Sequence, residues 1–305
     1  MRGNAHPTEK KPHKTRPVES ILITRGSPVS DFAMITVSQT DRVLNITLNR
    51  PDDLNPLCWQ VLNEIKDVLD NVVNDNGVGV IVIGAAGKAF STGYDLREEH
   101  WITSQYPANF EDQVDIRRDR DDVHIIVDYW MKLWRYPKPI IAKVQGDCLS
   151  GAGELLGVCD LAIVSERARF GHPAGRDLGI PPSIMFWPML IGLRKTKELL
   201  YTSRLISAVE AQQIGLVNEV VPHDQLDDRV AMTAAHIARA PSDNLSVLKE
   251  VSNTWFENMG MEPSVRRGAD LDAIYHQFDS FKDFFRTLRK EGVKAAFKKR
   301  RDLFG

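Results

Sequence analysis

The chain has few cysteines, almost no net charge and no long hydrophobic run, and each shortage argues against a class of protein. Its three cysteines, Cys58, Cys148 and Cys159, lack the spacing of a metal site or a disulfide framework, which favours reduced thiols in a cytoplasmic protein. The net charge of −2 argues against a nucleic-acid partner. No apolar run approaches the roughly 20 residues of a membrane span, so we expect no membrane partner.

What the chain does have is an alternation of short apolar runs with amphipathic segments. The runs at 34–39, 43–48 and 79–84 predict strands, and residues 58–73 place their apolar side chains on one helical stripe. Strands that alternate with helices favour an α/β fold built on a parallel sheet.

The 305 residues suffice for one large core with a smaller helical part. We expect a flexible N-terminal tail over 1–32, a core over 33–207 and a helical C-terminal subdomain over 208–305. The tail is rich in Pro, Lys and Arg and has little periodicity, and a basic targeting segment is the alternative interpretation.

Two glycine-containing turns follow predicted strands. The first spans Gly146 to Glu154, after the strand PIIAKVQ, and the second lies within AFSTGYDL at 89–96. Glycine lets backbone come close to a ligand, and the first amides of a helix have no internal partners. Two such turns can aim two N–H groups at one oxygen and form an oxyanion hole. Glu154 is then a candidate base, although a Glu in a first helical turn is also stabilised by the helix dipole alone.

These segments resemble the crotonase (enoyl-CoA hydratase/isomerase) superfamily. LNRPDDLNPL, AFSTGYDL, GDCLSGAGELLGVCDL, ARFGHP, SAVEAQQIGLVNEVVP and EGVKAAFKKRRDLF follow one another in the order found in that family, across residues 34–305. The resemblance implies a spiral of ββα repeats with a helical C-terminal trimerisation subdomain. It further implies an acyl-CoA substrate without a separate cofactor or metal, and a homotrimer or a dimer of trimers.

The resemblance also assigns roles to individual residues. The two oxyanion amides fall on Tyr94 and Gly151, and the first catalytic carboxylate falls on Glu154. The second catalytic glutamate of the hydratases falls on Ala174, so another group must replace it. Asp177 and His172 are candidates, each with a structural alternative as a loop support or ion pair. The positions that the family places around the CoA ester are Leu54, Ala89, Ser91, Gly93, Asp95, Leu96 and Lys298.

The segment 97–123 is long and charged, with interleaved aromatic residues. A solvated insertion with a helical second half is one interpretation. The other is a lid over the acyl pocket that carries His100, Trp101 and Tyr106, with His100 as a further acid or base.

Three functions remain open from the sequence. The first is an enoyl-CoA hydratase or isomerase that works through a thioester enolate with Glu154 as base. The second is a crotonase-type hydrolase that cleaves a C–C or thioester bond of a CoA ester or a related β-dicarbonyl. The third is a non-catalytic homologue that binds CoA or RNA. Loss of the second glutamate favours the hydrolase over an ordinary hydratase, because syn-hydration uses two carboxylates.

Overall fold

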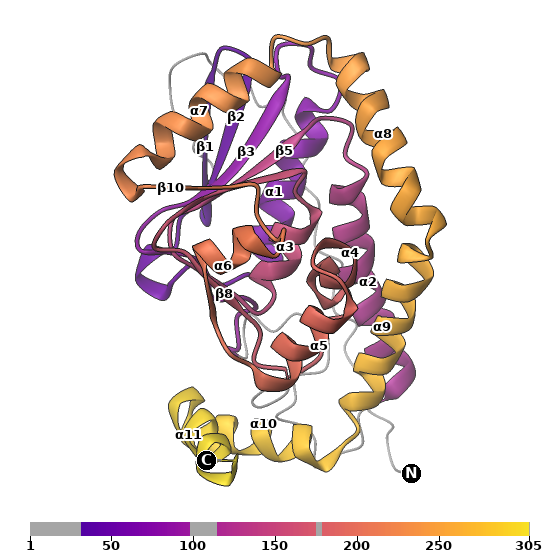
Figure 1. Ribbon diagram of the computed structural model, residues 1–305. Helices are drawn as coiled ribbons and strands as arrows, with labels where there is room; N and C mark the ends of the chain where they lie inside the picture. Colours follow the sequence, from indigo (N-terminus) through magenta and orange to yellow (C-terminus); the bar gives the residue numbers. More distant parts are fainter. Residues whose placement is uncertain (1–31, 98–114, 175–178, 305) are drawn as a thin grey trace, which may run out of the picture.

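The structure is a computed structural model, and it describes residues 32–97, 115–174 and 179–304. Its main element is a six-stranded sheet in the order β1-β2-β3-β5-β7-β10, in which only the β1–β2 pair is antiparallel (Figure 1). The strands are β1 (Ile35–Thr40), β2 (Val43–Leu48), β3 (Val80–Ala85), β5 (Ile140–Val144), β7 (Leu161–Ser165) and β10 (Glu219–Val221). The strands expected at 34–39, 43–48 and 79–84 are therefore confirmed.

A second sheet of four short strands lies beside the first. Its order is β4-β6-β8-β9, with β4 (Ala89–Ser91), β6 (Asp147–Leu149), β8 (Arg169–Gly171) and β9 (Ile206–Ser207). Successive strands of the chain alternate between the two sheets, as β3 then β4, β5 then β6, and β7 then β8. Helices α2 (Ile116–Trp134) and α3 (Ala152–Val158) follow the first two pairs. This arrangement confirms the expected α/β fold of ββα repeats.

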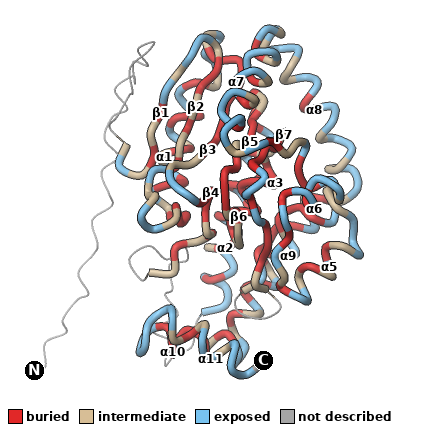
Figure 2. Tube along the Cα trace, turned by 60° about the vertical axis from the view of Figure 1, so that its left-hand side comes forward, coloured by how far each residue is buried: buried red, intermediate tan, exposed pale blue. Residues whose placement is uncertain are grey.

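Helices cover both faces of the large sheet. Along β3, Val80 and Val82 pack toward α7 (Leu226–Ile237), whereas Ile81 and Ile83 belong to the main core. Helix α1 (Trp59–Val72) lies in that main core with α2 and α3, and the expected stripe on residues 58–73 is buried along it. Because side chains alternate across a strand, burial on both faces requires the uninterrupted apolar run in β3. Figure 2 shows this buried interior.

The C-terminal part, after residue 207, first completes the large sheet and then forms helices outside it. Strand β10 and helix α7 complete the large sheet, so the segment after residue 207 begins inside the α/β core. Helices α8 (Ser242–Asn258) and α9 (Met261–Tyr275) then run along one side of the molecule (Figure 1). Helices α10 (Asp279–Glu291) and α11 (Val293–Phe304) form a separate small core beneath, against which Leu96 packs. The division at residues 32 and 207 stays a prediction.

Several sequence expectations fall outside the described residues. These are the tail 1–31, the segment 98–114 with His100, Trp101 and Tyr106, and Asp177. The helical second half expected for 97–123 is confirmed, because α2 begins at Ile116. No helix within the described ranges is long and apolar enough to cross a membrane. The three cysteines are unbridged, with Cys58 and Cys148 buried.

Candidate active site

The two glycine-containing turns predicted from the sequence lie against each other. Strands β4 and β6 pair in parallel, so their carboxyl ends deliver both turns to the same edge. A Cβ added at Gly93 would lie 2.8 Å from the amide nitrogen of Gly151 and 2.6 Å from Cβ of Ser150. Gly93 also has φ +94°, a conformation that favours glycine. The close approach of the turns therefore depends on the absence of a side chain at residue 93.

Two backbone amides at this junction have no acceptor within the described part of the chain. They belong to Tyr94 and Gly151. On either side of Tyr94, the carbonyl of Gly93 accepts from the amide of Leu57 and the amide of Asp95 donates to the carbonyl of Leu57. Alternate amides of an extended segment point in opposite directions, so the Tyr94 N–H points away from Leu57. Unpaired backbone donors are uncommon in folded proteins, which makes this pair a candidate ligand site.

Glu154 lies in the first turn of α3 and is fully buried. Its carboxylate accepts hydrogen bonds from the hydroxyl of Tyr94, the hydroxyl of Ser183 and the amide of Ser183, the last at 3.3 Å. Burial raises the pKa of Glu154, and the hydrogen bonds from Ser183 and Tyr94 oppose that rise. Glu154 is thus a carboxylate held in a dry site by three donors, with its affinity for a proton increased.

Tyr94 stands between Glu154 and a large cavity. Its ring contacts Gly151, where an added Cβ would lie 2.6 Å from Cε2 of the ring. The indole N–H of Trp130 on α2 donates to the Tyr94 hydroxyl at 2.9 Å. Burial raises the pKa of Tyr94 well above its ordinary value, and the charge of Glu154 raises it further. The phenol therefore stays protonated and donates a hydrogen bond to Glu154.

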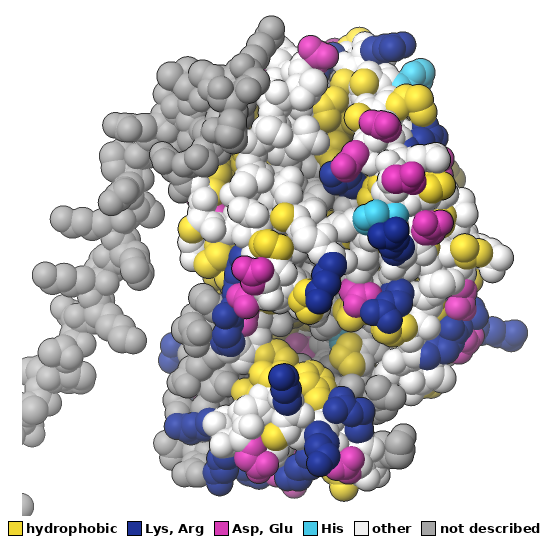
Figure 3. Space-filling view, turned by 90° about the vertical axis from the view of Figure 1, so that its left-hand side faces the viewer, with side chains coloured by type: hydrophobic (Ala, Val, Ile, Leu, Met, Phe, Trp, Pro, Cys, Tyr) yellow, Lys and Arg dark blue, Asp and Glu magenta, His cyan; other side chains and the backbone are white. Residues whose placement is uncertain are grey.

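The cavity has a volume of about 630 Å³ and is lined mostly by apolar side chains. Its walls come from the two turns, from α2 and α9, and from the C-terminal pair α10 and α11. Figure 3 shows a hollow between the body of the molecule and the C-terminal helices below it, with hydrophobic side chains along its lower wall. Tyr94 lines the cavity, whereas Glu154 lies behind it and is not part of the described lining.

His172 lines the same cavity beside the position of the missing glutamate. Its Nδ1 accepts from the amide of Ala174 at 2.9 Å, and its Nε2 lies 3.5 Å from the hydroxyl of Ser150. Burial lowers the pKa of His172 to about 3, so the ring is neutral at physiological pH. These contacts match a support for the loop, and they leave Nε2 as the only ring nitrogen that carries a proton.

A buried group of three titratable side chains borders the cavity, and our sequence analysis missed it. His276 Nδ1 lies 2.6 Å from Oδ2 of Asp119 on α2, and His276 Nε2 lies 3.5 Å from Oδ1 of Asp272 on α9. Asp272 and His276 line the cavity. The i, i+4 spacing of Asp272 and His276 on one helix was a usable signal. Asp119 gave none, because it lies in a charged segment whose neighbours are exposed.

The residues expected around the CoA ester divide into two sets. Ala89, Ser91 and Gly93 shape the backbone of β4 and its turn, and Leu54 accepts from the amide of Thr92 at 3.2 Å. Asp95 and Leu96 line the cavity, while Lys298 is exposed on α11.

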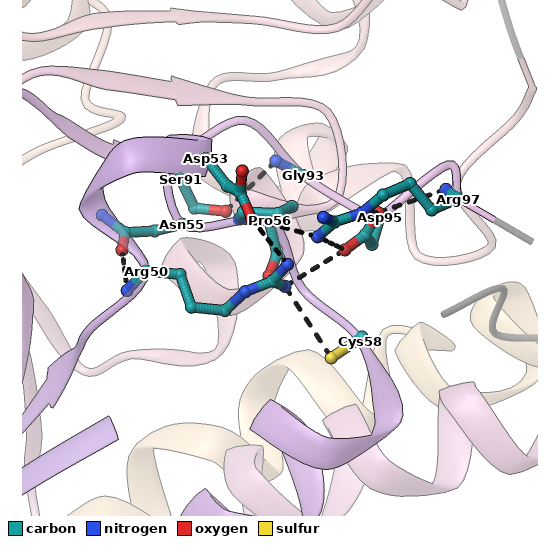
Figure 4. Close-up of polar contacts among 9 residues, drawn as sticks. All are labelled: Arg50, Asp53, Asn55, Pro56, Cys58, Ser91, Gly93, Asp95 and Arg97. Atoms are coloured by element: carbon teal, nitrogen blue, oxygen red, sulfur yellow. Dashed lines mark hydrogen bonds and ion pairs between the residues drawn. The ribbon is translucent and has the colours of Figure 1, made fainter. Parts of the chain in front are cut away.

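Asp95 is the centre of a charged cluster beside the cavity (Figure 4). It accepts from Arg50 at 3.1 Å and from Arg97 at 2.6 Å, and both arginines also contact Asp53. Asp53 thus shares with Asp95 in neutralising the two guanidinium groups. Within the described residues, no group of three or more His, Cys, Asp or Glu is arranged to hold a metal ion.

Comparison with known proteins supports the resemblance found in the sequence. A model of the enoyl-CoA hydratase/isomerase family matches residues 38–304. The probable enoyl-CoA hydratase of Mycobacterium tuberculosis is 32% identical over 279 residues, which cover 90% of this chain and 98% of the relative. The 4-chlorobenzoyl coenzyme A dehalogenase-1 of an Arthrobacter species is 33% identical over 218 residues, which cover 70% of this chain and 76% of the relative.

Solved structures give the same result. An enoyl-CoA hydratase from Mycobacterium smegmatis superposes with a TM-score of 0.81 at 26% identity, over 90% of this chain and 95% of that one. An enoyl-CoA hydratase/isomerase from Xanthobacter autotrophicus superposes with a TM-score of 0.79 at 30% identity, over 90% of this chain and 99% of that one.

Proposed function

Because the chain belongs to the enoyl-CoA hydratase/isomerase family, we propose that it transforms an acyl-CoA thioester through an enolate held by the backbone amides of Tyr94 and Gly151. The observation that carries this proposal is the pair of unpaired amides at the junction of two turns, next to a buried carboxylate. Each such donor is worth about 3 to 4 kcal/mol when charge develops on the carbonyl oxygen.

In this proposal Glu154 is the base that takes the proton of the attacking water. The Tyr94 hydroxyl connects it to the substrate, since the hydroxyl borders the cavity and already donates to Glu154. The phenol passes its own proton to Glu154 as it receives one from the water. Its raised pKa is consistent with this relay, because the phenol is not lost as phenolate between turnovers.

The CoA phosphates are expected at the mouth of the cavity. Arg97 and Asp53 line that region, and Lys and Arg side chains stand on both sides of the hollow (Figure 3). The two aspartates of the cluster already neutralise much of the charge of Arg97. Additional positive charge must therefore come from α11, which lines the cavity with Phe297 and exposes Lys298 next to it.

A second candidate function is hydrolysis of a C–C or thioester bond of a CoA ester. The observation that favours it is Ala174, whose methyl group cannot transfer a proton at the position of the second hydratase carboxylate. In that reaction Glu154 activates water in the same way, and the two amides hold the oxygen of the carbonyl under attack.

Mass spectrometry separates these reactions. The protein is incubated with a panel of enoyl-CoA and β-ketoacyl-CoA esters, including aromatic acyl groups because one relative is named for a benzoyl-CoA substrate. Gain of one water by an intact CoA ester supports hydration. Cleavage of a carbon–carbon bond by water, or release of free CoA, supports the hydrolase. Isomerisation leaves the mass unchanged and is detected by chromatography of the products.

We also propose that the protein assembles as a homotrimer, alone or paired into a hexamer. Helix α8 exposes an apolar stripe at i, i+4 spacing, formed by Val247, Val251, Trp255 and Met259, whose residues are 58% to 74% exposed. An exposed apolar face of this kind is typical of an interface between subunits. Analytical ultracentrifugation tests the proposal, and a monomer at micromolar concentration would contradict it.

A further inference from the structure

We propose that Asp272, held by His276 and Asp119, is the second proton-transfer group of this enzyme and takes the role that Ala174 cannot fill. The inference rests on the proposed function, because it concerns the proton delivered to the α-carbon of the enolate. It assigns one catalytic residue, Asp272, and two positioning residues, His276 and Asp119, none of which the family motifs indicate.

The placement of Asp272 is the first support. It projects from α9 into the wall of the cavity that Tyr94 and Ser150 also line. Its Oδ1 accepts from the amide of Ile180 at 3.3 Å, so it contacts the continuation of the loop that carries Ala174. Burial is the main cause of the raised pKa values of both Glu154 and Tyr94, and the charge of Asp272 adds to each. The two carboxylates therefore interact electrostatically across one site.

The row of titratable groups behind Asp272, in which His276 is hydrogen-bonded to Asp119 and lies within ion-pair distance of Asp272, is the second support. Asp119, His276 and Asp272 are almost fully buried, and the ring of Phe281 stacks on His276 with centroids 4.3 Å apart. A row of carboxylate, imidazole and carboxylate holds its outer member in one orientation and stabilises it in either protonation state. The row joins α2 to α9, so the wall of the cavity itself fixes the position of Asp272.

The titratable groups that act on Asp272 are His276, at the C-terminal end of α9, and Asp119 on α2. The charge of Asp272 in turn raises the pKa of Tyr94 and of Glu154. Burial raises the pKa of Asp272 to about 6, and the positive charge of His276 opposes that rise. A carboxyl with a pKa near neutrality can both give and take a proton at physiological pH.

The atoms balance for hydration of an enoyl-CoA. An O–H bond of water breaks and a C–O bond forms at the β-carbon, while the electron pair of the C=C bond moves onto the thioester as an enolate. The proton of the water reaches Glu154 through Tyr94. The enolate then takes a proton from Asp272, which forms the C–H bond at the α-carbon. One proton that returns from Glu154 to Asp272 through solvent restores both groups.

Two reactions measured on four variants test the assignment. The reactions are hydration of an enoyl-CoA and exchange of the α-hydrogen of a saturated acyl-CoA with D₂O, the second of which needs only the group that serves the α-carbon. The variants are D272N, E154Q, D119N and the control D270N. Asp270 also joins α9 to α2, through His124 at 3.1 Å, but it lies outside the cavity lining that the structure describes.

We expect D272N to lose hydration and exchange by about 10²- to 10⁴-fold, with binding of a saturated acyl-CoA unchanged. E154Q should lose hydration and keep exchange, and D270N should keep both within a few-fold. D119N should move the pH profile of exchange without abolishing it, as a positioning role requires.

Two results would overturn the inference. One is a D272N enzyme that keeps both reactions at the wild-type rate, and the other is exchange that E154Q loses while D272N keeps it. Wild-type protein that performs neither reaction on any ester would instead overturn the proposed function. Thermal unfolding of each variant shows whether a loss of activity comes from a loss of folding.

Discussion

Replacing Tyr94 with phenylalanine tests the link between the cavity and the buried base. The substitution removes one hydroxyl that donates to Glu154 and accepts from the indole of Trp130. A hydrogen bond to a charged acceptor contributes about 1.5 to 3 kcal/mol. Without it the carboxylate form of Glu154 is less stable, so the pKa of Glu154 rises above its already raised value. At 1.36 kcal/mol per pKa unit, the rise is about one to two units.

The assay is kcat/KM as a function of pH. The base must be deprotonated to act, so activity falls as pH drops through the pKa of Glu154, and Tyr94→Phe should move this acidic limb upward by about one to two pH units. The maximal rate should also fall by about 10² or more, because the relay is gone. The unpaired indole N–H of Trp130 should lower the free energy of unfolding by about 1 to 3 kcal/mol.

Tyr129→Phe is the matched control. Tyr129 is buried on α2 and, like Tyr94, lies next to Trp130, against which it packs edge-on with ring centroids 5.0 Å apart, but its hydroxyl has no hydrogen-bond partner among the described residues. Its removal should leave both activity and the acidic limb unchanged. If Tyr94→Phe behaves like this control, the relay and the electrostatic role of Tyr94 are both refuted.

Three further predictions concern the base, the subunit interface and the buried carboxyl. Glu154→Gln should abolish hydration while isothermal titration finds the affinity for a CoA ester nearly intact, because glutamine keeps the shape but cannot accept the proton. Trp255→Glu should dissociate the trimer in analytical ultracentrifugation, whereas Tyr201→Glu on α5 (Leu193–Thr202), exposed to a similar extent, should not. Folding raises the pKa of Asp272 from 3.8 to about 6, so the protonated carboxyl favours the folded state. This contribution to stability is complete below pH 3.8 and is lost as the pH rises through 6. The Asp272→Asn variant does not undergo this loss. The difference in free energy of unfolding between variant and wild type should therefore be more favourable to the variant at pH 7 than at pH 4, by at most about 3 kcal/mol in urea titrations.

Much of the fold follows from local pattern. The stripe on residues 58–73 predicted α1 to within a residue at each end, and the apolar run of β3 predicted a strand buried on both faces. The two glycine-containing turns were also visible, because small residues after a strand are a local feature. The sequence did not indicate that β10, 54 residues after the end of β7, would complete the large sheet, since three residues carry no periodicity.

The amino-acid sequence by itself indicated the family, the two turns and the place of Glu154 in the first turn of a helix. Only the tertiary structure decided what surrounds that carboxylate. The Tyr94–Glu154 hydrogen bond joins residues 60 apart, and the contact between Asp119 and His276 joins residues 157 apart. Such contacts depend on how helices and sheet pack, because burial of apolar surface brings together polar groups that no local spacing connects. The absence of a glutamate at Ala174 was therefore readable from the sequence, whereas the candidate that replaces it became visible only when α2 and α9 were packed together.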